Sequence, residues 1–327
     1  MVSSGESGFK ISVVVLSYNQ SSGSLFQTLN SLVSQDCDSF EIVVADDASR
    51  ENPREAIERY FAESGFSDYQ IIIRESNVGT VKNVLEGTIR ARGEFIKIIG
   101  AGDLLYSHDT LSKMYEFCAA HEINHAFGRI KTFTEKDGVL TIQAFDAPTK
   151  PEMYHEPQDR QAILAQMLIK SDWIPGGAII YRRSYLIDYL AELADGYGVR
   201  LVEDLVSVLV AFSGSIQFYD EFIMWYEWGV GGSNDGTRAS RKKAYADHTR
   251  FFSELKKRHR DSGTVKKAYL VFRIKRFVMI YTPLAESLRR IKARQYLKKP
   301  IDQTGEMPPE RSFLIENLSS HLDANGK

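Results

Sequence analysis

The sequence predicts an α/β fold: a mainly parallel sheet flanked by helices, with a helical extension at the C-terminal end. Three observations support this prediction. Short apolar runs rich in β-branched residues alternate with segments of helical periodicity, a rhythm typical of βαβ units. Polar clusters stand directly after several of these runs, where a parallel sheet places its ligands. Residues 238–299 carry 20 Lys and Arg against 4 Asp and Glu, a net charge of +16, whereas residues 1–237 have a net charge of −15.

Length and composition favour one large domain with an appendage. The chain has 327 residues, of which 43% are hydrophobic, enough to fill a core. We expect a disordered N-terminus at residues 1–9, one α/β domain at 10–235, and a basic, amphipathic helical extension with a polar tail at 236–327. Cys37 and Cys118 form no CxxC pair, which favours a reducing compartment. With neither a signal-peptide pattern nor a membrane-length apolar run, the expected location is cytoplasmic.

The expected elements of the first half alternate strictly. Residues 11–16 are β-branched and apolar and predict a strand that ends at Ser17-Tyr18-Asn19. Helical spacing from Leu25 to Val33 predicts a helix, with Ser24 as its candidate N-cap. The same criteria predict strands at 41–45, 69–74 and 94–99 and helices at 53–63 and 81–91.

The second half is less regular. The predicted helices cover residues 107–120, 160–169 and 184–193, with a further helix starting at Glu203-Asp204. The predicted strands cover residues 126–133, 139–145, 178–181 and 224–228. Residues 229–234 predict a glycine-rich mobile loop.

The strand at 94–99 stops abruptly at Gly100-Ala101-Gly102-Asp103. Glycine lets a ligand approach the backbone closely, and a carboxylate at the end of a central strand can hold a divalent cation. A plain β-turn in which Asp103 caps the following helix fits the same residues. Both interpretations stay open from this stretch alone.

The other polar clusters follow strands in the same way. Tyr18 and Asn19 follow the first strand, Asp46 and Asp47 the second, and Asn77 the third. Because the carboxyl ends of parallel strands meet at one edge of a sheet, we expect these residues and Asp103 to line one crevice.

These motifs together resemble the family 2 glycosyltransferases, inverting enzymes of the GT-A fold that include builders of bacterial surface polysaccharides. The resemblance rests on the order Ser17-Tyr18-Asn19, Ser31-Leu32 with Gln35, EIVVADDAS at 41–49, NVGTVKN at 77–83, GEFIKIIGAGD at 93–103, and Glu203-Asp204. It implies a Rossmann-like GT-A domain. It also implies transfer of a hexosyl or N-acetylhexosaminyl group from a nucleoside-diphosphate sugar, a UDP-sugar first, to an acceptor hydroxyl.

The resemblance also implies a donor site. It places Tyr18 and Asn19 beside the base and ribose, and Asp46 and Asp47 as acceptors of hydrogen bonds from the nucleotide. Carboxylates can accept from a ring N–H and from hydroxyls. The ribose and diphosphate side is implied for Asn77, Gly79, Lys82, Asn83 and Gly102.

The metal motif departs from the family. Relatives carry two or three acids where this chain has Gly100, Gly102 and only Asp103. The resemblance implies that Asp103 is a ligand of Mg²⁺ or Mn²⁺, and oxygen coordination suits these ions. A metal-independent variant stays open.

Glu203-Asp204 is the candidate catalytic pair. By resemblance Asp204 removes the proton of the acceptor hydroxyl, and Glu203 orients the acceptor or the base. Two acids at a helix start are also simply favourable to the helix dipole. Two other functions fit the nucleotide-site motifs, namely a nucleotidyltransferase and a catalytically inactive module that binds sugar nucleotides.

One zinc-protease pattern is rejected. His121-Glu122-Ile123-Asn124-His125 matches HExxH, which needs both histidines on one continuous helix. Here the pattern straddles the end of a predicted helix and the start of a predicted strand.

The basic extension contains an apolar stripe with alternating spacings of four and three residues. Three interpretations stay open: packing on the catalytic domain or in a homodimer, an anionic membrane surface, or nucleic acid, for which no module is recognisable. We predict peripheral membrane association through residues 265–299, with a glycan or lipid-diphosphate-linked sugar as acceptor. The stripe comprises Leu270, Ile274, Phe277, Tyr281, Leu284, Leu288 and Ile291.

Overall fold

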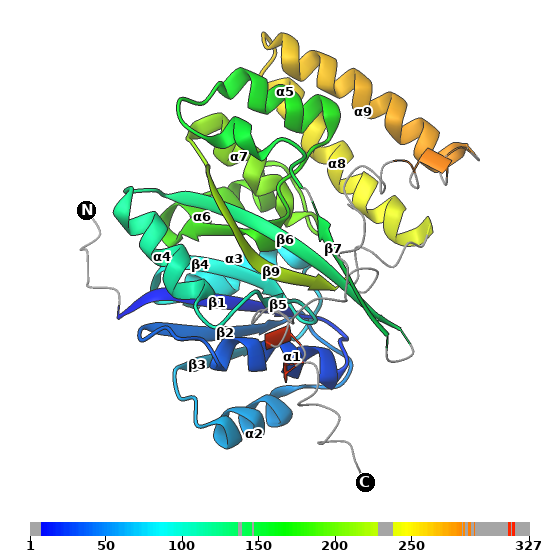
Figure 1. Cartoon of the computed structure of the whole chain (residues 1–327). Coiled ribbons are helices and arrows are strands. Elements are labelled where there is room, and N and C mark those ends of the chain that lie inside the picture. The colour runs from blue at the N-terminus through cyan, green and yellow to red at the C-terminus, as the bar shows by residue number, and fades with distance from the viewer. Residues whose placement is uncertain are drawn as a thin grey trace.

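The computed structural model describes residues 8–136, 139–145, 147–227 and 238–282, together with residues 284, 287, 288, 291, 313, 314, 316 and 317. In this part the chain forms one nine-stranded mixed sheet with helices on both faces (Figure 1). The strand order is β3-β2-β1-β4-β8-β6-β9-β5, and β7 pairs with β6. The predicted 229–234 loop lies outside the described residues.

The strands fall into a parallel half and a mixed half. Strands β1 to β4 pair in parallel, whereas β8 joins β4 antiparallel and β6 and β9 run parallel to each other. The bounds are β1 Phe9–Ser17, β2 Phe40–Asp46, β3 Tyr69–Ile73, β4 Gly93–Gly100, β5 Leu104–Leu105, β6 His125–Lys136, β7 Val139–Phe145, β8 Ile179–Arg182 and β9 Gln217–Glu227.

The helices follow the predicted order with shifted ends. Helix α1 starts at Ser22 rather than after Ser24, because the Ser21 side chain accepts from the backbone N–H of Ser24 and is the N-cap. The bounds are α1 Ser22–Val33, α2 Arg54–Ser64, α3 Thr80–Arg90, α4 Thr110–Ala120, α5 Arg160–Lys170, α6 Arg183–Ala191, α7 Val206–Ser213, α8 Arg238–Arg258 and α9 Gly263–Tyr281. Short helical turns lie at Pro151–Tyr154, Gly176–Ala178, Glu192–Gly196 and Glu203–Leu205.

The connections of the parallel half decide where its polar ends lie. Helices α1 and α2 link neighbouring strands in one direction, and α3 returns from β3 to β4, so right-handed crossovers place α3 on the opposite face. At the start of β4, a Cβ on Gly93 would lie 2.4 Å from the backbone N of Ser12. Glycine therefore lets β4 pack closely against β1, and the ends of β1, β2 and β4 share one edge.

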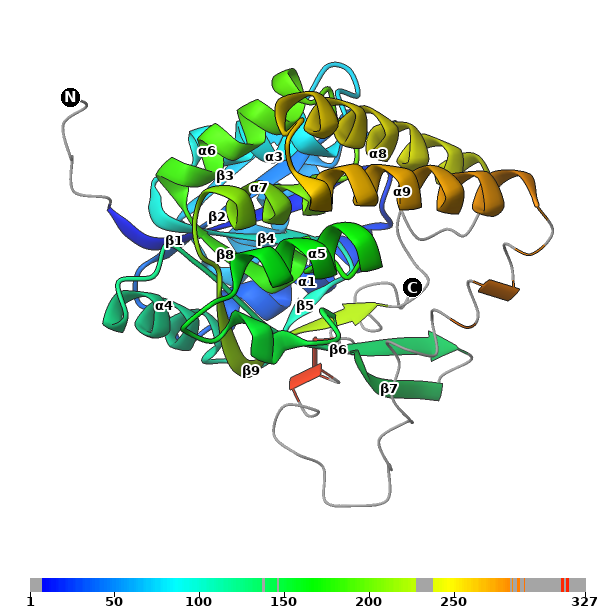
Figure 2. The same ribbon diagram turned by 90° about the horizontal axis from the view of Figure 1, so that it is seen from above.

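The basic extension packs on the body through one face. Helix α9 packs against α5 and α8 packs against α9 (Figure 2), and the Phe252 and Phe272 rings stack between α8 and α9 with centroids 4.6 Å apart. Val265 and Ala268 are buried on the same face of α9. The interpretation in which the Leu270–Ile291 stripe packs on this chain's catalytic domain is wrong, because all seven stripe residues are 43–62% exposed.

Among the described residues, no helix combines the length and the apolar character that crossing a bilayer requires.

Candidate functional site

The first polar turn at the sheet edge is held by Asp46, the last residue of β2. Its carboxylate accepts from the backbone N–H of Ser49 at 2.8 Å and from the Ser49 hydroxyl at 2.6 Å. Asp46 is fully buried. A nucleotide contact of the predicted kind therefore requires Ser49 to share or release this carboxylate.

Asp47 connects this turn to the loop that precedes α3. Its two carboxylate oxygens accept from the backbone N–H groups of Val78 and Gly79, at 2.8 and 2.9 Å. The Asn77 side-chain amide donates to the Asp47 carbonyl at 3.3 Å. Asp47, Asn77 and Gly79 are thus brought together as predicted, with Asp47 shaping the loop.

Gly79 is the position at which this loop meets a distant segment. Its φ is +93°, and a Cβ there would lie 2.6 Å from the carbonyl oxygen of Arg200. That carbonyl accepts from the Val81 N–H at 2.9 Å, while the Arg200 guanidinium donates to the Asn77 and Val78 carbonyls, each at 3.4 Å. Only glycine fits this junction without displacing the backbone.

Tyr18 and Asn19 lie at the end of β1 beside the Asp46 turn. The Asn19 N–H donates to the Ser49 hydroxyl at 2.7 Å, and its side-chain oxygen accepts from the Arg50 N–H at 2.9 Å. The Tyr18 side chain is 48% exposed. An exposed ring beside a polar turn can stack on a nucleobase.

Two further predicted donor residues are bonded to other partners. Asn83 is buried, and its amide nitrogen donates to the Ala45 carbonyl at 2.8 Å, so this side chain secures α3 to β2 and does not line the crevice. Lys82 forms an exposed ion pair with Asp195 at 3.2 Å. The apolar spacing of α3 predicts a helix, but it does not tell which of the polar residues on that helix face the sheet.

Three hydrogen bonds, to Leu16 of β1 and Thr28 of α1, hold the Gly100–Asp103 turn. Ala101 N–H donates to the Leu16 carbonyl at 2.9 Å, which ties the turn to the end of β1. The Thr28 hydroxyl accepts from Gly102 N–H at 2.9 Å and donates to the Asp103 carbonyl at 2.7 Å. Gly102 has a φ of +107°. Asp103 is therefore presented on a preorganised turn.

The pKa of the Asp103 carboxyl depends on burial and on two nearby charges. Burial raises its pKa to about 7, the nearby charge of Glu227 adds to the rise, and the Lys97 charge opposes it. Its Oδ1 accepts from the backbone N–H of Glu227 at 3.2 Å. A bound cation would favour the charged form, and two carboxylates at one turn are the oxygen donors that Mg²⁺ and Mn²⁺ take.

Lys97 is a fully buried basic residue that the sequence patterns did not mark as part of the site. Its ammonium group donates to the carbonyls of Ile98 and Gly177, and burial lowers its pKa to about 7, opposed by Asp103. Lys97 lies on β4, and its bond to the Gly177 carbonyl joins this strand to the turn at 175–177. A single lysine in an otherwise apolar buried strand was a signal for such a role.

Glu203 and Asp204 lie against the same turn. The Gly176 N–H donates to Asp204 Oδ1, and a Cβ on Gly176 would lie 2.6 Å from that oxygen. Burial raises the pKa of Asp204 to about 6, and the hydrogen bond from Gly176 opposes the rise. Burial and then the Asp204 charge raise the pKa of Glu203 to about 8. The two carboxyls therefore titrate as a coupled pair, and the bond from Gly176 favours the charged form of Asp204.

The basic extension reaches this site through Asp247 of α8. Its buried carboxylate accepts from the backbone N–H groups of Arg200 and Leu201, at 3.2 and 2.6 Å. The segment that leads to Glu203 and Asp204 is thus bonded to the 77–79 loop through Arg200, and to α8 through the N–H groups of Arg200 and Leu201.

The HExxH pattern forms no metal site. Helix α4 ends at Ala120, Glu122 has a φ of +52°, and His125 starts β6 among tyrosine rings. Within the described part of the chain, no group of three or more His, Cys, Asp or Glu side chains is arranged to hold a metal ion.

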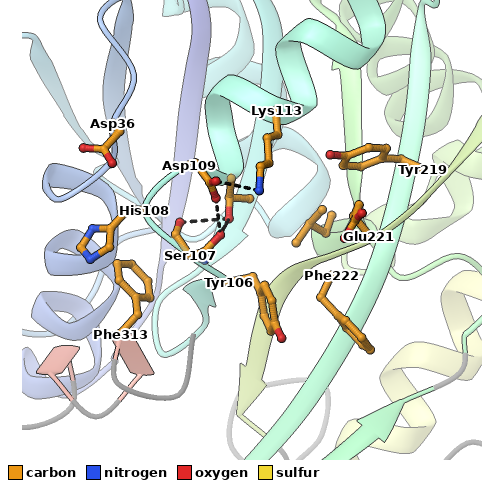
Figure 3. Close-up of a pocket in the computed structure, with 12 residues that line it drawn as sticks. Asp36, Tyr106, Ser107, His108, Asp109, Lys113, Tyr219, Glu221, Phe222 and Phe313 are labelled. Atoms are coloured by element: carbon orange, nitrogen blue, oxygen red, sulfur yellow. Dashed lines mark hydrogen bonds and ion pairs between the residues drawn. The ribbon is translucent and has the colours of Figure 1, made fainter. Parts of the chain in front are cut away.

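A separate cavity of about 280 Å³ lies between the start of α4 and the first half of β9 (Figure 3). Tyr106, Tyr219 and Phe222 line it beside an ion pair between Asp109 and Lys113. None of the predicted site residues lines this cavity. The predicted site residues lie instead at the polar turns that follow the strands, and these turns are the candidate site.

The comparisons with known proteins agree with this geometry. A family model described as "Glycosyl transferase family 2" matches residues 12–190, more than half of the chain. A "PGL/p-HBAD biosynthesis glycosyltransferase" of Mycobacterium tuberculosis (strain ATCC 25177 / H37Ra) is 32% identical over 94 residues, which are 29% of this chain and 36% of that protein. The same figures hold for the protein of that description from Mycobacterium bovis (strain BCG / Pasteur 1173P2). The match thus spans about a third of these relatives.

Solved structures share the fold. Residues 1–349 of S. aureus TarS in complex with UDP-GlcNAc align with a TM-score of 0.55 and 18% identity, covering 97% of this chain and 83% of that one. The mannosyltransferase PcManGT from Pyrobaculum calidifontis, in complex with GDP-Man and Mn²⁺, aligns with a TM-score of 0.51 and 16% identity, covering 96% and 80%. The predicted GT-A fold is confirmed by these neighbours.

Proposed function

The chain belongs to glycosyl transferase family 2, and from that premise we propose that it transfers a sugar from a UDP-sugar to an acceptor hydroxyl with inversion. The observation that carries the proposal is the position of Asp204. It is held in its charged form by the Gly176 N–H, beside a more weakly acidic Glu203. A general base in a partly dehydrated crevice needs this protonation state at neutral pH.

The donor side is assigned to residues already organised for it. Tyr18 offers its exposed ring to the base, and the loop at 77–79, held by Asp47 and Arg200, faces the sugar and diphosphate. TarS with UDP-GlcNAc supports a UDP-sugar. Because PcManGT is in complex with GDP-Man, a GDP-sugar is the second donor to test.

The reaction needs one proton transfer and one displacement. The acceptor oxygen bonds to the anomeric carbon from the face opposite the diphosphate. The bond to the diphosphate oxygen breaks with its electron pair, and the hydroxyl proton passes to the Asp204 carboxylate. Mg²⁺ or Mn²⁺ held at Asp103 would supply positive charge for the leaving group. Lys97, anchored to the Gly177 carbonyl, keeps the Asp103 strand and the Asp204 turn together.

The acceptor is proposed to be a glycan or a lipid-diphosphate-linked sugar at the inner face of a cell membrane. The α9 stripe supports this, because Leu270, Ile274, Phe277 and Tyr281 are all about 60% exposed. Residues 262–285 contain no Asp or Glu, and Lys266, Lys267 and Arg273 are exposed beside the stripe. An amphipathic helix with basic flanks matches an anionic bilayer.

The charge argues against a second copy on this stripe. A symmetric pair would bring the basic flanks of two α9 helices together with no acidic residues between 262 and 285 to offset them. A bilayer of anionic lipids removes that repulsion. We therefore propose a cytoplasmic enzyme in surface-glycan synthesis that binds the membrane surface peripherally.

Product analysis tests the function. The protein is first screened with UDP- and GDP-sugars by thermal shift, because a ligand that binds only the folded state raises its melting temperature. The donor that binds is then incubated with lipid-linked and free sugar acceptors. Free nucleoside diphosphate and a product of inverted anomeric configuration by NMR support the proposal. Pyrophosphate release indicates a nucleotidyltransferase, and binding without any product indicates an inactive module.

A further inference from the structure

The Gly100–Asp103 turn lacks two acids, yet carboxylate oxygens occupy the space beside both glycines. A Cβ on Gly100 would lie 3.3 Å from Asp103 Oδ2, and a Cβ on Gly102 would lie 3.1 Å from Glu227 Oε2. The glycines therefore do more than remove two acids from the motif. They leave room for two carboxylates, one of which comes from the end of β9.

Backbone pairing holds Glu227 at this place. Leu104 and Leu105 of β5 pair with Trp225 and Met224 of β9, directly before Glu227. The Glu227 N–H then donates to Asp103 Oδ1 at 3.2 Å. Because a strand and a hydrogen bond fix the Glu227 backbone beside Asp103, its side chain is presented at the same turn.

We propose that Glu227 is the second carboxylate ligand of the divalent cation, taking the place of the acids missing at positions 100 and 102. The cation is then held between Asp103 and Glu227 on one side and the donor diphosphate on the other. This inference rests on the proposed function, because the diphosphate supplies the remaining oxygen ligands. Two carboxylates together with phosphate oxygens and water suit Mg²⁺ and Mn²⁺.

Electrostatics fit this arrangement. Asp103 and Glu227 are both partly buried, and two carboxylates close together repel each other, a cost that a divalent cation between them removes. Lys97 also faces Asp103, but its ammonium group is bonded to the Ile98 and Gly177 carbonyls. Lys97 therefore lies on the buried side of Asp103, and Glu227 is the acid that completes the turn.

Mn²⁺ binding measured by electron paramagnetic resonance tests the inference without requiring turnover. The free-ion signal is titrated with the full-length chain, with and without UDP, for the unaltered protein, Glu227→Gln and Glu221→Gln. Glu221 is an exposed acid on the same strand and serves as the matched control. We expect Glu227→Gln to weaken Mn²⁺ binding in the presence of UDP by about tenfold or more. Glu221→Gln should bind Mn²⁺ like the unaltered protein.

Two further measurements separate loss of a ligand from loss of structure. Glu227→Asp keeps the charge on a shorter side chain and should retain part of the Mn²⁺ affinity, whereas Asp103→Asn should lose most of it. UDP binding without metal should be the same in Glu227→Gln and the unaltered protein. The inference is overturned if Glu227→Gln binds Mn²⁺ as tightly as Glu221→Gln, or if the unaltered protein binds UDP but no Mn²⁺. Failure to bind any nucleotide would overturn the proposed function itself.

Discussion

The backbone N–H of Gly176 donates a hydrogen bond to Oδ1 of Asp204, with 2.5 Å between the two atoms. This bond favours the charged carboxylate, whereas burial and the charge of Asp204 raise the pKa of the neighbouring Glu203. The two adjacent acids therefore lie in unequal surroundings, and the proposal assigns them different roles on this ground.

Replacing Asp204 by Asn should be the most damaging change at the pair. The amide keeps the shape but takes no proton, so we expect transfer to fall by about a hundredfold or more while donor affinity persists. Glu203→Gln keeps the shape of a side chain whose pKa burial and the Asp204 charge raise, and it should cost much less. Steady-state kinetics with nucleotide-binding measurements check both variants. A more severe loss in Glu203→Gln would exchange the two roles.

The pH dependence of transfer should follow Asp204. Its pKa, raised by burial to about 6, means that the base becomes active as pH rises through about 6. If Glu203 were the base, the rise would come near 8 instead. A profile of kcat/KM between pH 5 and 9 distinguishes the two midpoints, and Glu203→Gln should keep the lower one.

The pH dependence of the stability of the ligand-free protein should reflect the titration of Glu203. Its pKa is raised by folding, so the folded protein binds the proton more tightly than the unfolded chain. This contribution is complete below the ordinary glutamate pKa and is lost as pH rises through about 8. Glu203→Gln does not titrate, so its melting temperature should rise relative to the unaltered protein between pH 5 and 9. A constant difference across that range would contradict the assignment.

Gly79→Ala should disrupt the donor loop. The φ of +93° and the 2.6 Å approach to the Arg200 carbonyl both oppose a side chain. Backbone strain of this kind costs about 1–3 kcal/mol, and UDP affinity should fall as well. Gly65→Ala is the matched control, because Gly65 has a φ of +72° with nothing within 4 Å. Thermal melts and UDP titrations should show lost stability in both variants and lost UDP affinity only in Gly79→Ala.

Membrane binding should depend on the α9 stripe. Phe277→Glu places a negative charge among exposed apolar residues and should abolish sedimentation with anionic vesicles at low salt. Ile89→Glu changes another exposed apolar residue, on α3, and should leave binding intact. Binding by the unaltered protein should weaken as salt rises, because attraction to the surface is screened within about 10 Å at 0.1 M. Equal sedimentation of both variants would contradict the membrane role of the stripe.

The sequence predicted the parallel half of the fold well, because its signals are local. Each strand from β1 to β4 is a short apolar run followed by a helix, and the structure moves their ends by only one or two residues. Strand β9 was predicted only from Met224, although it begins at Gln217. Asp220 and Glu221 are exposed in its first half and hide the strand from a search for apolar alternation.

The candidate site was predictable where a residue follows its own strand. Asp46, Asp47 and Asp103 lie at the expected edge for that reason. Glu227 and Arg200 were missed, since their places depend on pairing between β5 and β9 and on a contact between distant loops. Asn83 was wrongly placed in the crevice, because helical spacing alone does not tell which side faces the sheet.

Strand pairing also fixes the order in which the two sides of the crevice can assemble. The strands β1 to β4 are contiguous in sequence except for their crossover helices, so they can pair once about the first 100 residues have left the ribosome, whereas the loop at 77–79 must wait for its bonds with Arg200. Strand β5 has β9 as its partner and must wait for Trp225. A nascent chain therefore acquires the Asp46 and Asp47 turns well before the Asp103 turn gains its support from β9. Detachment of β9 in the finished protein would remove that support from the Asp103 turn and leave its bonds to Leu16 and Thr28 in place.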